Sequence, residues 1–244
     1  MRSILASVLL PLLLAISALP QNIPSGTVLP VMLSSTLDSR RAKSGQTING
    51  RLKQNVFLPN GSVLPRNTKV IGHIVSASAP ATGQAARISL QFDYLLWAGR
   101  KIAITAHLRA LASMNEVFEA KMPTNSWDDY GTSPSDWNTI QVGGAGVFRG
   151  SGQLIADGEV IGRATDYGAV TARLIAAPQR GCPNTANDHE QSLWIFSPWA
   201  CGVYGLPGVT IAHAGRTAPV GLIELASSRF VRVNGGSGWL LRVD

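Results

Sequence analysis

Short runs in which apolar and polar residues alternate, separated by turn residues, limit what this chain can fold into. Residues 47–52 and 87–94 are two of the cleanest runs. Alternation with a period of two places the apolar side chains on one face of a β-strand. Asn60-Gly61 lies between apolar residues, which is a strong signal for a β-hairpin. We therefore predict a mainly β protein, a β-barrel or β-sandwich built from short antiparallel strands.

The composition agrees with this fold class. The 244 residues include 25 glycines and 14 prolines, a balance that suits tight turns better than long helices. Hydrophobic residues make up 45% of the chain and charged residues 14%, so the chain can bury a core and is not of the disordered type. Its length is enough for one large β domain or two small ones.

The N-terminus has the three-part plan of a secretory signal peptide. Arg2 gives a positive start, residues 4–14 are largely apolar, and small residues follow up to Ala18. The apolar run is shorter than the roughly 20 residues of a spanning helix, and no later segment is long and apolar enough to span a bilayer. We predict that residues 1–18 are removed and that the protein is exported, to the periplasm or the medium. A retained N-terminal anchor is the alternative.

The two cysteines, Cys182 and Cys201, agree with export. An even number of cysteines in an exported chain favours a disulfide. A bond that closes a loop of this length contributes about 3 kcal/mol in the chain-entropy view. A metal site would need more ligands at short spacing, and a catalytic thiol has no supporting motif. We predict a structural disulfide.

The chain divides into three parts after the signal peptide. Residues 19–109 read as a barrel-like domain of strands and turns. Residues 110–145 read as a linker or insertion, with a short helix over 110–121 and then a long polar loop. Residues 146–244 form a second β-rich region that holds the cysteines and either completes the first domain or stands apart.

The net charge of +7 raises the question of an anionic partner. The basic residues are scattered, and one short run, Arg40, Arg41 and Lys43, lies in a polar turn. No aromatic residues interleave with these charges, which disfavours nucleic acid as the partner. Envelope polymers, anionic lipids or other envelope proteins are left as candidate partners.

Turn and strand residues between 23 and 105 follow a characteristic order. They are Ile23–Pro30, Ser44–Gln46, Asn55–Val56, Val63–Pro65, Val70–Gly72, Gly83–Gln84 and Ala86–Ile88. In this order the segment resembles the barrel domain of TrbI-like proteins, the scaffold component of conjugation and type IV secretion channels. The resemblance implies a periplasmic β-barrel of similar make.

Three departures limit the resemblance to the barrel itself. Asn67 stands where the family pattern has glycine. The barrel pattern begins next to the expected cleavage site, without the family's long proline-rich segment. Residues 110–145 are polar and lack the family's membrane-inserting helical hairpin. The resemblance therefore implies a related barrel and not a secretion channel.

Aromatic residues supply one candidate binding surface. Trp127, Tyr130 and Trp137 lie in the polar loop, where aromatic side chains can anchor a sugar or a peptide. Trp194 and Trp199 are interpreted as core residues beside the disulfide. The same loop holds Asp128, Asp129 and Asp136. They are candidates for a glycosidase-like carboxylate pair, although solvated loop acids are the favoured interpretation.

One local cluster of titratable groups is present, Asp188-His189-Glu190, between the two cysteines. It could form a metal or acid–base site with a partner from elsewhere, such as His213. A solvated loop is the favoured interpretation. The sequence has no Gly-x-Ser-x-Gly nucleophile motif and no phosphate-binding loop, so we predict no cofactor, no metal and no catalytic residue.

Three hypotheses for function follow. The first is an exported envelope protein of β structure with a binding or structural role. The second is a secreted hydrolase that degrades a polymer, with carboxylates from 128–136 or 188–190. The third is an accessory of a secretion or conjugation apparatus, which ring-forming oligomerisation would support.

Overall fold

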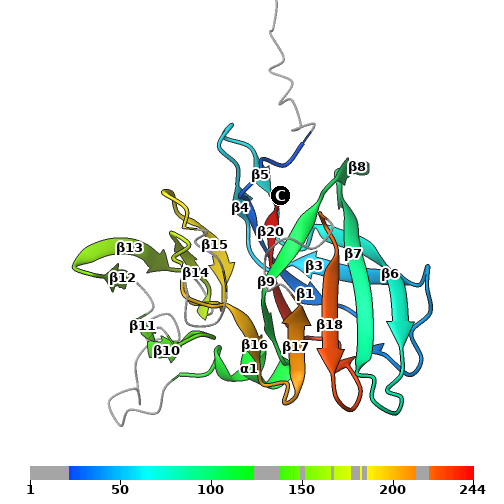
Figure 1. Ribbon diagram of the computed structural model, residues 1–244. Coiled ribbons are helices and arrows are strands. Elements are labelled where there is room, and N and C mark those ends of the chain that lie inside the picture. Colours follow the sequence, from blue (N-terminus) through cyan, green and yellow to red (C-terminus); the bar gives the residue numbers. More distant parts are fainter. Residues whose placement is uncertain are drawn as a thin grey trace, which may run out of the picture.

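The described part of the chain folds into strands with one short helix (Figure 1). The computed structural model describes residues 22–123, 138–144, 146–148, 152–165, 168–176, 182, 186–212 and 220–244. The predicted mainly β, barrel-like fold class is confirmed. In the described part of the chain, no helix has the length and apolar character needed to cross a membrane.

Ten strands form the main sheet, which curls into a nearly closed barrel (Figure 1). The strand order is β16-β9-β20-β1-β3-β6-β7-β18-β17, and β8 pairs with β7. All neighbours are antiparallel except β16, which runs parallel to β9. The strands are β1 (Val28–Leu33), β3 (Thr47–Leu52), β6 (Lys69–Ser78), β7 (Ala86–Trp97), β8 (Arg100–Ala103), β9 (Ala106–Ala112), β16 (Gly202–Tyr204), β17 (Val209–Ala212), β18 (Ile223–Ser227) and β20 (Gly238–Val243).

Apolar side chains from alternate strand positions fill the barrel. In β3 the residues are exposed and buried in strict alternation, as the sequence predicts. Trp239 is fully buried, and its ring meets the Phe92 ring edge-on with 5.9 Å between the centroids. An edge-to-face pair of this kind adds to the burial of two large side chains, so it helps to fix the centre of the barrel.

A separate four-stranded sheet packs beside the barrel (Figure 1). Its antiparallel strands, in order, are β12 (Gln153–Ala156), β13 (Glu159–Ala164), β14 (Val170–Ala172) and β15 (Gln191–Trp194). All four residues of β15 are buried, because this strand packs against β1 and against β4 (Val56–Phe57) of the barrel part. The four-stranded sheet is thus attached to the barrel through β15.

Three two-stranded ribbons and a helix complete the described part of the structure. β4 pairs with β5 (Val63–Leu64) around the predicted Asn-Gly turn. The other ribbons join β2 (Leu37–Asp38) to β19 (Arg232–Val233), and β10 (Asn138–Ile140) to β11 (Gly146–Phe148).

The predicted helix over 110–121 is wrong at its N-terminal end, because helix α1 spans Met114–Glu119. Strand β9 continues to Ala112, and the Ser113 side chain then caps the helix by accepting a hydrogen bond from the Glu116 backbone N–H at 3.2 Å. Pairing of β9 with β20 and β16 therefore overrides the local helix signal.

The predicted disulfide between Cys182 and Cys201 is confirmed, with 5.9 Å between the two Cα atoms. Cys201 lies directly before β16. The Cys182 sulfur lies 3.7 Å from the carbonyl oxygen of Arg109 in β9. The bond therefore lies against the barrel wall, beside the strand pair β9 and β16.

Gly72 provides a test of the barrel packing. It lies where the register of β6 against β7 shifts, and a Cβ there would clash with the Gln91 carbonyl oxygen and come within 2.9 Å of the Phe92 Cα. We expect Gly72→Ala to lower the free energy of unfolding by about 1–3 kcal/mol, measured by urea denaturation. Gly146→Ala is the control, because a Cβ there meets no described atom within 4 Å. Equal stability of the two variants would contradict the close approach.

Candidate functional site

Several predicted site residues lie outside the described residues. These are the aromatic candidates Trp127, Tyr130 and Trp137, the loop acids Asp128, Asp129 and Asp136, and His213. The predicted cluster Asp188-His189-Glu190 is described, and all three residues are exposed just before β15.

Glu190 connects this cluster to the four-stranded sheet. Its carboxylate accepts a hydrogen bond from the Thr171 hydroxyl at 3.3 Å and lies 3.7 Å from Nε of Arg163. Across the described residues, no group of three or more His, Cys, Asp or Glu side chains is arranged to hold a metal ion. Through Glu190, the cluster borders an open cleft that Thr171 and Arg163 help to line.

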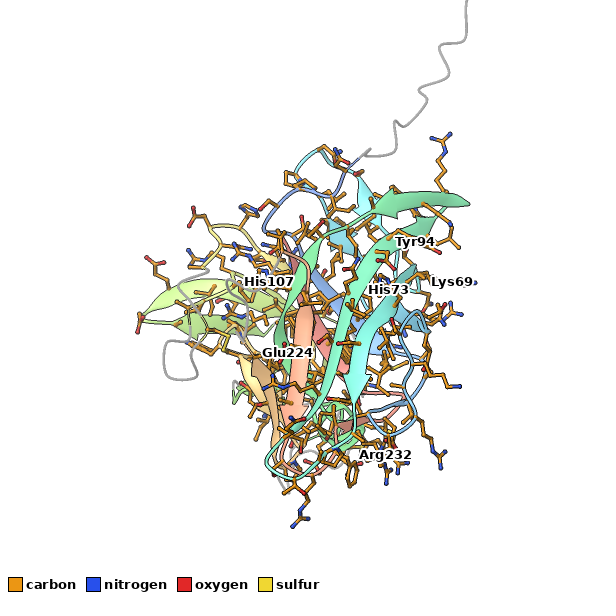
Figure 2. All side chains as sticks on the ribbon, turned by 45° about the vertical axis from the view of Figure 1, so that its right-hand side comes forward. Lys69, His73, Tyr94, His107, Glu224 and Arg232 are labelled. Atoms are coloured by element: carbon orange, nitrogen blue, oxygen red, sulfur yellow. A yellow bond between two sulfur atoms is a disulfide. The ribbon has the colours of Figure 1, made fainter. Side chains whose placement is uncertain are left out.

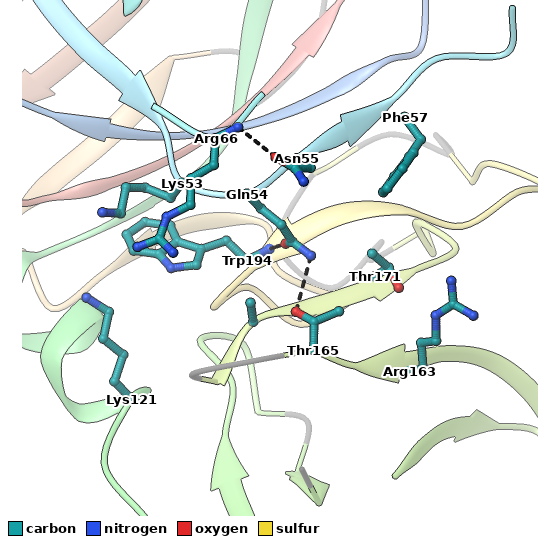
Figure 3. A pocket seen from close by; sticks show the side chains of 11 residues that line it. Lys53, Gln54, Asn55, Phe57, Arg66, Lys121, Arg163, Thr165, Thr171 and Trp194 are labelled. Carbon is teal, nitrogen blue, oxygen red and sulfur yellow. Dashed lines mark hydrogen bonds between the residues drawn. The ribbon is translucent and has the colours of Figure 1, made fainter. Parts of the chain in front are cut away.

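An open cleft of about 510 Å³ lies between the four-stranded sheet and the β4 end of the barrel (Figure 3). Its volume falls in the range of about 300–1,000 Å³ that is typical of ligand sites. We call it the basic cleft. It is lined by Lys53, Gln54, Asn55, Phe57, Arg66, Lys121, Arg163, Thr165, Ala169, Thr171 and Trp194.

Distant segments of the sequence bring four cationic side chains to the basic cleft. Lys53 follows β3, Arg66 follows β5, Lys121 follows α1, and Arg163 belongs to β13. Among the described residues that line the cleft, none is acidic. The site therefore concentrates positive charge from the barrel side, the helix and the four-stranded sheet.

Trp194 forms the floor of one end of the cleft. Its side chain is buried, and the ring lies beneath two ammonium groups, Lys53 Nζ at 5.9 Å and Lys121 Nζ at 5.2 Å from the centroid. Cation–π attraction of this kind holds both lysines over the ring. Because the ring is covered, it positions the lysines and is not available as a stacking surface for a ligand.

Gln54 fixes Trp194 to the barrel part. The Gln54 side-chain oxygen accepts a hydrogen bond from the Trp194 backbone N–H at 2.9 Å, and its amide nitrogen donates to the Thr165 hydroxyl at 3.3 Å. Trp194 has a φ of +54°, in the left-handed region that a bulky residue rarely adopts. The surroundings must over-determine such a backbone, which is a common property of functional sites.

Burial and neighbouring positive charges disfavour the charged forms of the two cleft lysines. Burial is the main reason that the pKa of Lys53 is lowered, and the nearby charge of Arg66 lowers it further. Burial also lowers the pKa of Lys121, with added repulsion from Lys53 and Arg66. Glu190 offsets Arg163 only weakly, because the two groups lie 3.7 Å apart and the Arg163 side chain is largely solvated. The cleft thus holds repulsion that a bound anion would relieve.

Other polar pairs lie elsewhere on the molecule. His73 Nδ1 lies 2.9 Å from the Asp93 carboxylate, and the His107 ring bonds to the Asp244 side chain. Figure 2 shows both histidines on the barrel, with His73 on the side away from the four-stranded sheet. Neither histidine lines the basic cleft, so neither contributes to its chemistry.

Two comparisons with known sequences found no match. No protein-family model matches the chain, and no curated protein matches its sequence. The resemblance to TrbI-like barrels therefore stays a prediction. What the cleft can do must follow from the residues that line it.

Burial of Lys53, with added repulsion from Arg66, gives a pH dependence of stability. The folded-state pKa of Lys53 is lower than its unfolded value, so the destabilising effect is complete below the folded pKa and disappears as the pH rises toward the unfolded pKa. We expect Lys53→Met to be more stable than wild type at pH 7, by less than about 1 kcal/mol, and the difference to shrink toward pH 11.

Urea denaturation across this pH range measures the effect, and Lys43→Met, in an exposed turn, is the control. A difference that stays constant or grows with pH would contradict the proposed cause.

Proposed function

We propose that this protein is an exported binding protein of the cell envelope that holds an anionic ligand in the basic cleft. One observation carries the proposal: four cations converge on an open cleft, and no described lining residue is acidic. Like charges brought together by folding repel one another, and a cleft lined by one sign of charge concentrates ligands of the opposite charge. A ligand with negative charge relieves the repulsion and gains charge-assisted hydrogen bonds.

The other lining groups favour binding over catalysis. They include the amides of Gln54 and Asn55 and the hydroxyls of Thr165 and Thr171, which are neutral hydrogen-bonding groups. Both hydroxyls already bond to protein side chains. The described lining residues include no histidine or carboxylate, the usual groups of general acid–base chemistry. The cleft therefore has the make-up of a recognition site.

Export is supported by two independent features. The N-terminal residues have the pattern of a signal peptide. The Cys182–Cys201 bond is compatible with an oxidising compartment, where structural disulfides form and persist. Outside the cytoplasm, anionic ligands include the charged polymers of the envelope, which agrees with a basic, open site.

Charge reversal at Arg66 tests the binding site. With inorganic tripolyphosphate as the probe, we expect Arg66→Glu to weaken binding by about tenfold or more at low salt, because attraction becomes repulsion at the site. Isothermal titration calorimetry measures the dissociation constant. Arg100→Glu is the matched control, since it makes the same charge change in β8, outside the cleft. Equal losses in both variants, or no binding by wild type, would overturn the proposal.

Cell fractionation tests export. The chain should be expressed with its own N-terminus in a Gram-negative host, and the intact mass determined for each fraction. We expect a soluble periplasmic product that lacks residues 1–18, with both thiols resistant to alkylation until a reductant is added. A full-length, membrane-bound product with free thiols would contradict export as a cleaved, disulfide-bonded protein.

A further inference from the structure

The positive charge in the basic cleft is divided between two places. Lys53, Arg66 and Lys121 gather around Trp194, whereas Arg163 projects toward the opposite end (Figure 3). A compact anion could use only one of these places at a time. The division therefore fits an extended ligand that carries negative groups at separate points along its length.

Neutral hydrogen-bonding groups lie between the two charged places (Figure 3). A side-chain amide has two donor and two acceptor positions. Gln54 uses one donor for the Thr165 hydroxyl and one acceptor for the Trp194 N–H. One donor and one acceptor position are therefore left over by these two bonds, on a side chain already held in place. Such groups are suited to the hydroxyls of a sugar.

One aromatic ring of the cleft is exposed. Phe57 retains 65% of its accessible surface, because β4 points Val56 into the core and Phe57 outward. In Figure 3 the ring lies toward the same end of the cleft as Arg163. A large exposed aromatic side chain in an otherwise polar, charged cleft is a mark of recognition, and its face can pack against the apolar face of a sugar ring.

The same observations argue against single-stranded nucleic acid. Such sites stack successive bases on a series of aromatic side chains. Among the described lining residues the aromatic ones are Phe57 and Trp194, and the Trp194 ring is covered by two lysines. A single exposed ring with amides and hydroxyls beside it matches a sugar unit better than a run of bases.

We infer that the ligand of the basic cleft is an acidic glycan, a chain of sugars that bears carboxylate or sulfate groups. One acidic group lies on Lys53, Arg66 and Lys121, a second contacts Arg163, and a sugar ring at the Arg163 end packs on Phe57. The open cleft lets the glycan chain continue at either end. This inference rests on the proposed anion-binding function and specifies its ligand.

The test compares five probes by isothermal titration calorimetry on the mature protein. Two are acidic glycans of equal length, an alginate hexasaccharide and a sulfated dextran hexasaccharide. The third is the neutral dextran hexasaccharide, the fourth is tripolyphosphate, and the fifth is a single-stranded DNA hexamer. We expect at least one acidic glycan to bind about tenfold more tightly than tripolyphosphate, because it reaches both charged places, and the neutral glycan to bind too weakly to measure.

Two variants test the placement of the glycan. We expect Phe57→Ala to weaken binding of the acidic glycan by about fivefold and to leave tripolyphosphate binding unchanged. Phe118→Ala is the matched control, because this phenylalanine is 62% exposed and does not line the cleft. We expect Arg163→Gln to weaken glycan binding by about threefold, again without effect on tripolyphosphate.

The outcomes separate the inference from the proposed function. If tripolyphosphate binds in an Arg66-dependent manner but neither acidic glycan binds more tightly, the function stands and the glycan inference fails. Equal effects of Phe57→Ala and Phe118→Ala would also overturn it, as would tighter binding of a single-stranded DNA hexamer than of either glycan. If neither the anion nor the glycans bind, the proposed function itself fails.

Discussion

The attachment of β15 to the barrel is the constraint on which the basic cleft depends. At this joint, side chains of β15 bond to the backbone of the barrel part, and a side chain of the barrel part bonds to the backbone of β15. The Val28 N–H of β1 donates to the Gln191 side chain at 2.6 Å, and the Trp194 N–H donates to Gln54 at 2.9 Å. The Ser192 hydroxyl donates to the Asn55 carbonyl oxygen. These bonds satisfy backbone groups that burial of β15 removes from water, which would otherwise destabilise the joint.

Arg109, in the barrel strand β9, supports the same joint. Its side chain is 2% exposed, and its guanidinium donates to the carbonyl oxygens of Ala200 at 2.9 Å and Pro198 at 3.3 Å, and to that of Ile175. Burial, with added repulsion from Arg242, lowers the pKa of Arg109 to about 10. A buried cation is tolerated when carbonyl dipoles replace its water. Arg109 thereby ties the segments on both sides of β15 to β9.

The sequence predicted most of the features that depend on local chemistry. Alternation over 47–52 and 87–94 located β3 and the greater part of β7. The Asn60-Gly61 turn joins β4 to β5, and Gly61 has the φ of +79° that such a turn requires. Asn67, where the TrbI-like pattern has glycine, has a φ of +71°, a region that asparagine tolerates better than most residues.

Features set by distant contacts escaped prediction. No local pattern indicates the break between β8, which pairs with β7, and β9, which pairs with β20. Nothing local indicates that β16 runs parallel to β9. The basic cleft was missed because each of its cations stands in a different segment, where a single lysine or arginine reads as a solvated residue. Charge clustering in space, unlike a charge run, leaves no trace in the sequence.

The position of the cleft couples ligand binding to the joint between the two sheets. Arg66 belongs to the barrel side and Arg163 to the four-stranded sheet. A ligand that contacts both cations opposes separation of the two parts, because separation would cost its binding free energy. Without a ligand, the burial and the mutual repulsion that lower the pKa of Lys53 and Lys121 act on the same region. At this joint, ligand binding and the stability of the fold therefore depend on the same contacts. The strained Trp194 backbone is tolerated there because the barrel and the four-stranded sheet both hold it.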